Sequence, residues 1–160
     1  MRKFLLILLA SLLFMTGCGE SDYETDNKLM NDQAKELLVY IDNRDAEGLR
    51  GVFSQDVLDT VDLDDQIESF FEIYEGKIST SDVELGHSSD STDDGKITER
   101  YLSAYIHIET ETGNKYTIYF AGYQTIKRKP SMQGIYRISI TTETNEEYLL
   151  GKHISMSDLA

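Results

Sequence analysis

The sequence has little cysteine, little proline and few positive charges. Its 160 residues include one cysteine and one proline, and 15 basic residues stand against 29 acidic ones. A single cysteine excludes an intramolecular disulfide, so the fold has to be held together by a hydrophobic core. The formal net charge of −14 repels nucleic acid phosphates, which excludes a nucleic-acid-binding protein.

The one cysteine follows a short hydrophobic segment at the start of the chain. Two basic residues precede the apolar run 4–15, and small residues at positions 16 and 17 lead to Cys18. This order is typical of a secretory signal peptide. A helix of twelve residues is about 18 Å long, which is less than the hydrocarbon core of a bilayer at about 30 Å. The run is therefore too short to be a permanent membrane span.

The stretch LLFMTGCGES resembles the signal of a bacterial lipoprotein, in which a small residue precedes the modified cysteine. The resemblance implies cleavage between Gly17 and Cys18 and a diacylglycerol on the Cys18 thiol. Met15 replaces the usual leucine, but it is also apolar and similar in volume. The alternative is an ordinary secreted protein with a free thiol. Lipid chains on Cys18 would hold the protein on the extracytoplasmic face of the cell membrane.

The sequence predicts four parts along the chain. We expect the signal peptide at 1–17, the lipidated cysteine and a polar tether at 18–27, one domain at 28–143 and a C-terminal tail at 144–160. Removing the signal takes away two basic residues and no acidic one, so the formal net charge falls from −14 to −16. This charge also repels anionic lipid head groups, whereas cationic partners remain compatible with it.

Apolar spacing predicts three helices in the first half of the domain. One helix covers about 28–42, with apolar residues at i, i+4, i+7, i+8 and i+11 from Met30. A second, short helix follows Asp45, which can cap it. A third begins at Asp62 or Asp64 and ends near Gly76.

After Gly76 the apolar period changes to two, which predicts strands. A short strand at 83–87 and a polar loop lead to three longer strands at 97–110, 115–126 and 134–144. The first two of these are joined by a turn at 111–114. Alternation places one apolar side toward the helices and one wet, aromatic side toward solvent. The order of elements predicts an α+β fold with helices packed on an antiparallel sheet.

At this level the chain resembles the cystatin-like, cone-shaped α+β roll of the nuclear-transport-factor-2-like superfamily. The segments YIDNRDAEGLRGVFSQDVLD and DLDDQIESFFEIYEGKI are similar to a family of Gram-positive bacterial lipoproteins with such a domain. The resemblance implies a curved sheet wrapped around the helices. It implies no chemistry, because that family has no assigned activity and a fold does not determine function.

Enzymes of the cone fold place an acid, a histidine or a tyrosine inside the concavity. By alternation, His87 falls on the same side as Val83 and Leu85, so its imidazole could act as a base in an interior pocket. The alternative is that tyrosine hydroxyls merely cap the edge of the core. The candidate pocket residues are Tyr40, Tyr74, His87, Tyr116 and Tyr136.

The wet side of the sheet gives a different hypothesis, a contact surface for a protein or a glycan. Tyrosine offers contact area with a polar tip, as interfaces favour, and homodimerisation is the leading version. The alternative is that these side chains only pair across strands. The candidate interface residues are Tyr101, Tyr105, His107, Tyr119, Tyr123 and Arg137.

Metal and nucleophile motifs have no support in the sequence. The acidic segment that starts at Asp90 has Tyr101 where a calcium loop needs glutamate, and the three histidines have no zinc spacing. We expect no cofactor and no metal. The sequence therefore predicts a membrane-anchored domain that binds an envelope protein, a second copy or a small ligand without catalysis. The alternative is a pocket enzyme of the isomerase or dehydratase type.

Overall fold

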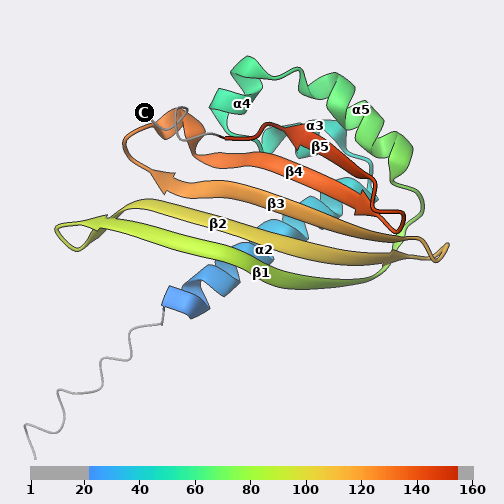
Figure 1. Cartoon of the computed structure of the whole chain (residues 1–160), viewed down its shortest axis with the longest axis horizontal. Coiled ribbons are helices and arrows are strands. Elements are labelled where there is room, and N and C mark those ends of the chain that lie inside the picture. The colour runs from blue at the N-terminus through green and yellow to red at the C-terminus, as the bar shows by residue number, and fades with distance from the viewer. Residues whose placement is uncertain (1–21, 155–160) are drawn as a thin grey trace, which may run out of the picture.

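Helices and a curved antiparallel sheet form the α+β fold in a computed structural model that describes residues 22–154. The sheet is a meander in the order β1-β2-β3-β4-β5, so every neighbour in space is also a neighbour in sequence. Figure 1 shows α2 behind the sheet, with α4 and α5 beyond its β5 edge. The elements are α2 (Asp22–Asp42), α3 (Ala46–Gly51), α4 (Gln55–Thr60), α5 (Leu63–Ile73), β1 (Ile78–Asp93), β2 (Lys96–Thr110), β3 (Lys115–Ile126), η2 (Pro130–Met132), β4 (Gly134–Thr142) and β5 (Glu147–Gly151).

The first helix, α2, buries the apolar face that its spacing predicts. Met30, Ala34, Leu37 and Ile41 are all buried and follow one another at three or four residues, about one turn, along the helix. The helix begins at Asp22, so residues 22–27 are helical where the sequence suggested a tether. Within residues 22–154, none of the helices has the length and apolar character needed to cross a membrane.

Three short helices follow, where the sequence indicated two. Asp45 caps α3, as expected, by accepting a hydrogen bond of 2.9 Å from the Gly48 N–H. Ser54 caps the unpredicted α4 in the same way, from the Val57 N–H. Helix α5 begins after Asp62 and buries Ile67 and its neighbouring phenylalanines, which confirms the third predicted helix.

The first strand is much longer than expected. The sequence suggested a strand at 83–87 and a polar loop, but β1 runs from Ile78 to Asp93. Only Asp94 and Gly95 turn the chain, with φ angles of 48° and 71°. An Asp-Gly pair with positive φ is the turn that matches the twist of a two-residue hairpin, so the polar residues before it can stay in the strand.

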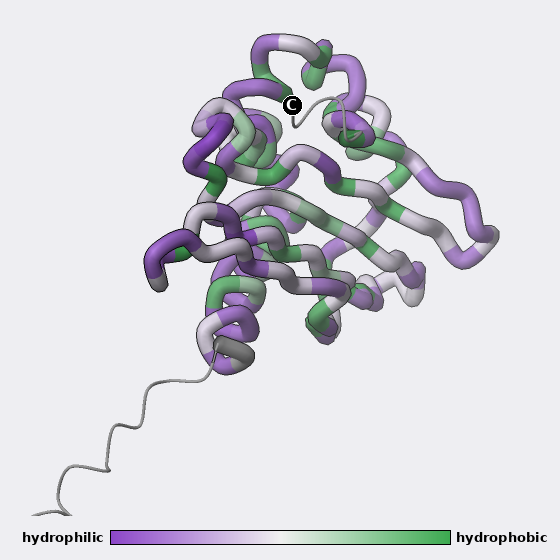
Figure 2. Tube along the Cα trace, turned by 60° about the vertical axis from the view of Figure 1, so that its left-hand side comes forward, coloured by the Kyte–Doolittle hydropathy of each residue, from purple (hydrophilic) through white to green (hydrophobic). Residues whose placement is uncertain are grey.

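The core lies between the sheet and the helices, and within residues 22–154 its members run from Met30 to Leu150. Val83, Ile106, Ile118 and Ile140 face one another across β1, β2, β3 and β4 and form one row of it. Figure 2 shows hydrophobic and hydrophilic residues alternating along the strands. The last strand, β5, adds Leu150 from the segment expected to be a tail.

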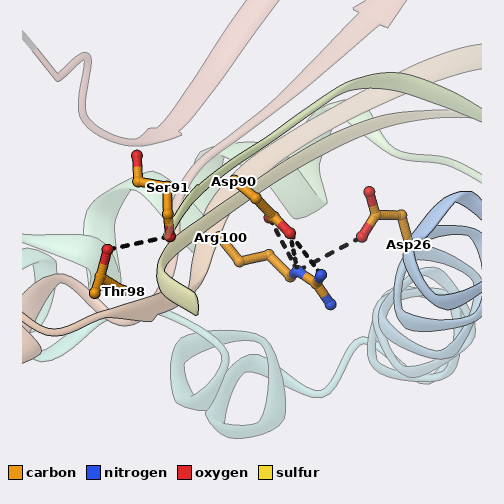
Figure 3. Close-up of polar contacts among 5 residues, drawn as sticks. All are labelled: Asp26, Asp90, Ser91, Thr98 and Arg100. Carbon is orange, nitrogen blue, oxygen red and sulfur yellow. Dashed lines mark hydrogen bonds and ion pairs between the residues drawn. The ribbon is translucent and has the colours of Figure 1, made fainter. Parts of the chain in front are cut away.

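A buried charge cluster ties the start of α2 to the hairpin of β1 and β2 (Figure 3). The Arg100 side chain is 10% exposed and binds the Asp90 carboxylate through Nε at 3.0 and 3.1 Å and Nη2 at 2.6 Å. Asp26, on α2, approaches the same guanidinium at 3.7 Å. Its Oδ1 atom is buried without a hydrogen-bond partner in the described part of the chain. The cluster therefore links the first turns of α2 to the hairpin by charge.

Candidate functional site

The outer face of the sheet, opposite the core, has a floor of small buried residues. Ser103, Ala121 and Ser139 lie on β2, β3 and β4 and are each at most 2% exposed. Register aligns their strands so that tyrosines stand on both sides of this floor. Because these side chains are small, the large tyrosine rings can pack over them. This packing buries the small residues and also reduces the exposure of the rings. We call this surface the tyrosine face; it comprises Tyr101, Tyr105, Tyr119, Tyr123 and Tyr136.

The rings of the tyrosine face contact one another in an ordered network. Tyr105 and Tyr119 pair across β2 and β3 with centroids 5.1 Å apart, and Tyr101 meets Tyr123 edge to face at 5.6 Å. The hydroxyl oxygens of Tyr101 and Tyr119 are 3.3 Å apart, within hydrogen-bond distance. Aromatic pairs at these separations each stabilise by about 0.5–1.5 kcal/mol beyond the area they bury. The face is therefore organised before any partner arrives.

One cation is held against this network. The Arg137 guanidinium lies 5.3 Å from the Tyr119 ring centroid and donates from Nη2 to Glu147 at 2.8 Å. A hydrogen bond from Ser139, followed by the Arg137 bond and charge, lowers the pKa of Glu147 despite some desolvation. Burial and then the hydrogen bond to Tyr101 raise the pKa of Tyr119 to about 12. Tyr119 is therefore neutral at physiological pH, and the Arg137 charge is matched by Glu147.

The six predicted interface residues all lie on this outer face. The network includes Tyr101, Tyr105, Tyr119 and Tyr123, and the Arg137 guanidinium contacts it at the Tyr119 ring. His107 lies further along β2, where its Nδ1 is 3.2 Å from the Thr117 hydroxyl and its Nε2 is 3.8 Å from Glu84. The sequence thus predicted which side these residues occupy.

His87 and Tyr136 also lie on the outer face, which corrects the prediction that they face the core. Leu85 pairs with Ala104 and His87 pairs with Ser103, so two steps along β1 match one step along β2. The extra residue, Gly86, forms a β-bulge, and the bulge moves His87 to the other side of the strand. Its ring centroid is 5.9 Å from that of Tyr101.

A second bulge, on β4, moves Tyr136. Ala121 pairs with Arg137 and Gly122 pairs with Ile135, which leaves Tyr136 as the extra residue. Its ring lies 6.4 Å from Tyr101 and 6.2 Å from Tyr123, centroid to centroid. Burial and a hydrogen bond with Tyr101 raise its pKa well above the ordinary value.

Glycine could have signalled both bulges. A Cβ on Gly86 would lie 2.9 Å from the Ser103 hydroxyl, and one on Gly122 would lie 2.5 Å from the Gly134 carbonyl oxygen. A glycine inside a strand often marks a bulge or a close backbone approach. Strict alternation ignores this signal. It therefore assigned His87 and Tyr136, which lie at or next to the bulges, to the wrong side of the sheet.

The other three pocket candidates do not form a shared site. Tyr74 is 1% exposed, and its ring contacts that of Tyr116 at 5.1 Å. The Tyr116 hydroxyl accepts from the Glu75 N–H at 3.1 Å and donates to a backbone carbonyl. Tyr40 bonds to Glu36 on its own helix at 2.9 Å. The five residues thus divide between the core, the surface of α2 and the outer face.

Two open hollows flank the tyrosine face, one toward each end of the sheet. The larger, of about 420 Å³, is lined by four threonines and by charged or polar residues that include Asp82, His107, Glu109, Lys115 and Glu143. The smaller, of about 340 Å³, lies between β1 and the start of β2. We call the smaller one the Tyr101 hollow; its lining residues are His87, Ser89, Ser91, Glu99, Tyr101 and Tyr123. Across residues 22–154, no group of three or more His, Cys, Asp or Glu side chains is placed to hold a metal ion.

The family model of DUF5104, a domain of unknown function, matches residues 36–143. The chain belongs to the DUF5104 family. The DUF5104 match begins in α2 and ends just after β4, so it includes most of the core and the whole tyrosine face. No curated protein matches the chain.

Proposed function

We propose that this protein is a lipoprotein anchored by Cys18 to the extracytoplasmic face of the cell membrane, where its DUF5104 domain binds a partner or ligand without catalysis. The basic start, the short apolar run and the small residues before Cys18 support the anchor. We further propose that the fold is the cone of the nuclear-transport-factor-2-like superfamily. The curved five-stranded meander with helices on its inner side supports that proposal.

The ordered tyrosine face, which no helix within residues 22–154 covers, is the observation that supports binding. In Figure 1 the described helices lie behind the sheet or beyond its β5 edge. Tyr105 is 40% exposed and contacts the network through Tyr119, while the other rings of the face are half-buried against one another. Rings that are already held in place lose little conformational entropy on binding, which is the advantage of a preorganised contact surface.

Charge and exposed area argue against a second copy as the main occupant. Two copies of a chain with a net charge of −16 repel each other, since most of the charge is uncompensated. Within residues 22–154, the large apolar side chains that are exposed are Val39, Tyr105 and Tyr148, which do not form one patch. A permanent dimer needs a large apolar interface, so the face fits a smaller or more polar occupant better.

No observation favours the pocket enzyme as a second candidate. Its histidine and one of its tyrosines lie on the outer face, on the other side of the sheet from Tyr74 and Tyr116. A general base has to reach the proton that it removes, and His87 does not reach a site shared with those residues.

Photocrosslinking in the host cell tests the proposed binding function. Tyr105 is replaced by a photoreactive phenylalanine analogue, and Tyr148 is replaced in the same way as the control. The two side chains are equally accessible, at 40% and 37%, but Tyr148 lies on β5 beside α5. We expect a specific adduct from position 105 alone. Equal labelling from both positions, or labelling only from position 148, would contradict the proposal, and an adduct of twice the chain mass would identify a homodimer instead.

A further inference from the structure

The Tyr101 hollow combines aromatic rings with hydroxyl groups in a space of ligand size. Its volume of about 340 Å³ is at the lower end of the about 300–1,000 Å³ found for small-molecule sites. Tyr101 and Tyr123 supply two half-buried rings that meet edge to face. Ser89 and Ser91 supply exposed hydroxyls from alternate positions of β1, and His87 adds an imidazole.

The hollow has no uncompensated charge. Its one carboxylate, Glu99, is paired with the Arg128 guanidinium through Nε at 2.6 Å and Nη2 at 3.3 Å. Such a two-point pair leaves the carboxylate fixed in direction, with its charge already neutralised. An anionic ligand would meet a chain of strongly negative net charge, and a cation would have to compete with Arg128. A neutral ligand meets neither obstacle.

The lining also selects against a purely apolar ligand. Serine hydroxyls, an imidazole and phenol hydroxyls would lose water on burial without gaining hydrogen bonds, which costs free energy for each group. A ligand that satisfies them must carry several hydroxyls or amides. It must also present a flat apolar side to the rings, because C–H groups pack favourably on the electron-rich face of tyrosine.

We propose that the Tyr101 hollow binds a neutral glycan, with a sugar ring stacked on Tyr101 and Tyr123 and its hydroxyls bonded to Ser89, Ser91 and Glu99. A pyranose has the required combination of one apolar face, a rim of hydroxyls and no charge. This inference rests on the proposed binding function and names its ligand class. The larger hollow lacks the exposed aromatic rings of this site. Its one tyrosine, Tyr116, is 7% exposed, and its hydroxyl is hydrogen-bonded to backbone groups.

Calorimetric titration of the chain from Gly19 to Ala160 tests the glycan site. This chain contains every core residue of the described range 22–154, from Met30 to Leu150, so we expect it to fold. The probes are two neutral trisaccharides, chitotriose and maltotriose, and the anionic trigalacturonate. We expect saturable binding of at least one neutral probe and none of trigalacturonate. Absence of neutral binding up to about 10 mM, which is weaker than most specific sites, would overturn the proposal.

Variants locate the binding in the hollow. Tyr123→Leu removes the ring and should lower the affinity for the neutral probe by about tenfold or more. Tyr123→Phe keeps the ring, so its affinity should stay within about threefold of the wild type. Ser89→Val, on the exposed edge strand, should also lower the affinity for the neutral probe. This variant decides the test if Tyr123→Leu does not fold. Tyr148→Ala is the matched control and should bind like the wild type. Unchanged affinity in a folded Tyr123→Leu or Ser89→Val chain would refute the site.

The crosslinking result separates this inference from the proposed function. If Tyr105 crosslinks specifically while no neutral probe binds, the tyrosine face contacts a partner and the glycan assignment is wrong. If neither occurs, both the ligand class and the binding function fail.

Discussion

Replacing Arg100 with methionine should destabilise the domain more than any change at the two carboxylates that face it. Methionine preserves much of the volume of the arginine stem but removes the cation. Asp26 and Asp90, whose side chains are 8% and 25% exposed, would then be left without their shared partner. Removing one member of a buried ion pair costs about 3–5 kcal/mol, because the remaining charge stays buried without compensation.

The same geometry predicts that Asp26→Asn has little effect. The Asp26 carboxylate is 3.7 Å from Arg100 and its buried Oδ1 accepts no hydrogen bond, whereas Asp90 forms three short contacts. Two carboxylates around one guanidinium leave an excess negative charge, so neutralising Asp26 keeps a balanced Asp90–Arg100 pair. We expect a change in the free energy of unfolding of less than about 1 kcal/mol.

Urea unfolding of the Gly19–Ala160 chain, followed by circular dichroism, measures both effects. The midpoint should fall for Arg100→Met with an unchanged slope, since the surface exposed on unfolding stays the same. A loss of about 3–5 kcal/mol is a large part of the about 5–15 kcal/mol typical of a domain. The reasoning is refuted if Arg100→Met costs less than about 1 kcal/mol, or if Asp26→Asn costs as much as Arg100→Met.

Three further predictions concern the anchor, the bulge and the buried phenol. Cys18→Ala should move the protein from the membrane to the soluble fraction of host cells, and unchanged membrane retention would exclude lipid on that thiol. Gly86→Val should cost about 1–3 kcal/mol by melting analysis, because its Cβ would lie 2.9 Å from the Ser103 hydroxyl; a neutral effect would contradict the bulge geometry. Burial raises the pKa of Tyr74 from 10.0 to about 12, so the unfolded chain loses this proton first and stability should fall by up to about 3 kcal/mol as the pH rises from about 10 to 12. The Tyr74 hydroxyl has no hydrogen-bond partner within residues 22–154, so Tyr74→Phe should stabilise the domain by about 1 kcal/mol and reduce its loss of stability at alkaline pH. Urea unfolding at pH 9 and 11 measures both effects, and the absence of both would contradict this account of Tyr74.

The apolar periodicity predicts the helices and the two sides of the sheet because burial dictates both. Met30, Leu37 and Ile41 repeat with the helical period, and Ile106 and Ile118 with the strand period, so their side chains could be assigned to the core from spacing alone. The turn between β2 and β3 was predictable from its composition, since Gly113 adopts a φ of 85° there.

The predictions failed where the backbone departs from regular alternation. A single extra residue at Gly86 or Tyr136 reverses the side of its neighbours, and no periodicity reports it. The length of β1 was missed because its second half is polar on both sides, which is how an edge strand avoids aggregation but also how a loop looks in sequence. The candidate site was therefore half predictable: the tyrosine rows were placed correctly, whereas His87 and Tyr136 were assigned to the wrong side.

Native mass spectrometry of the protein purified from host membranes tests the binding function most directly. The wild-type chain is compared with Tyr105→Ala and with Tyr148→Ala, which removes an equally exposed tyrosine away from the tyrosine face. We predict that a bound molecule of reproducible mass remains on the wild type and on Tyr148→Ala and is lost from Tyr105→Ala. A clean mass for the wild type, or retention that does not depend on Tyr105, would contradict binding through the tyrosine face.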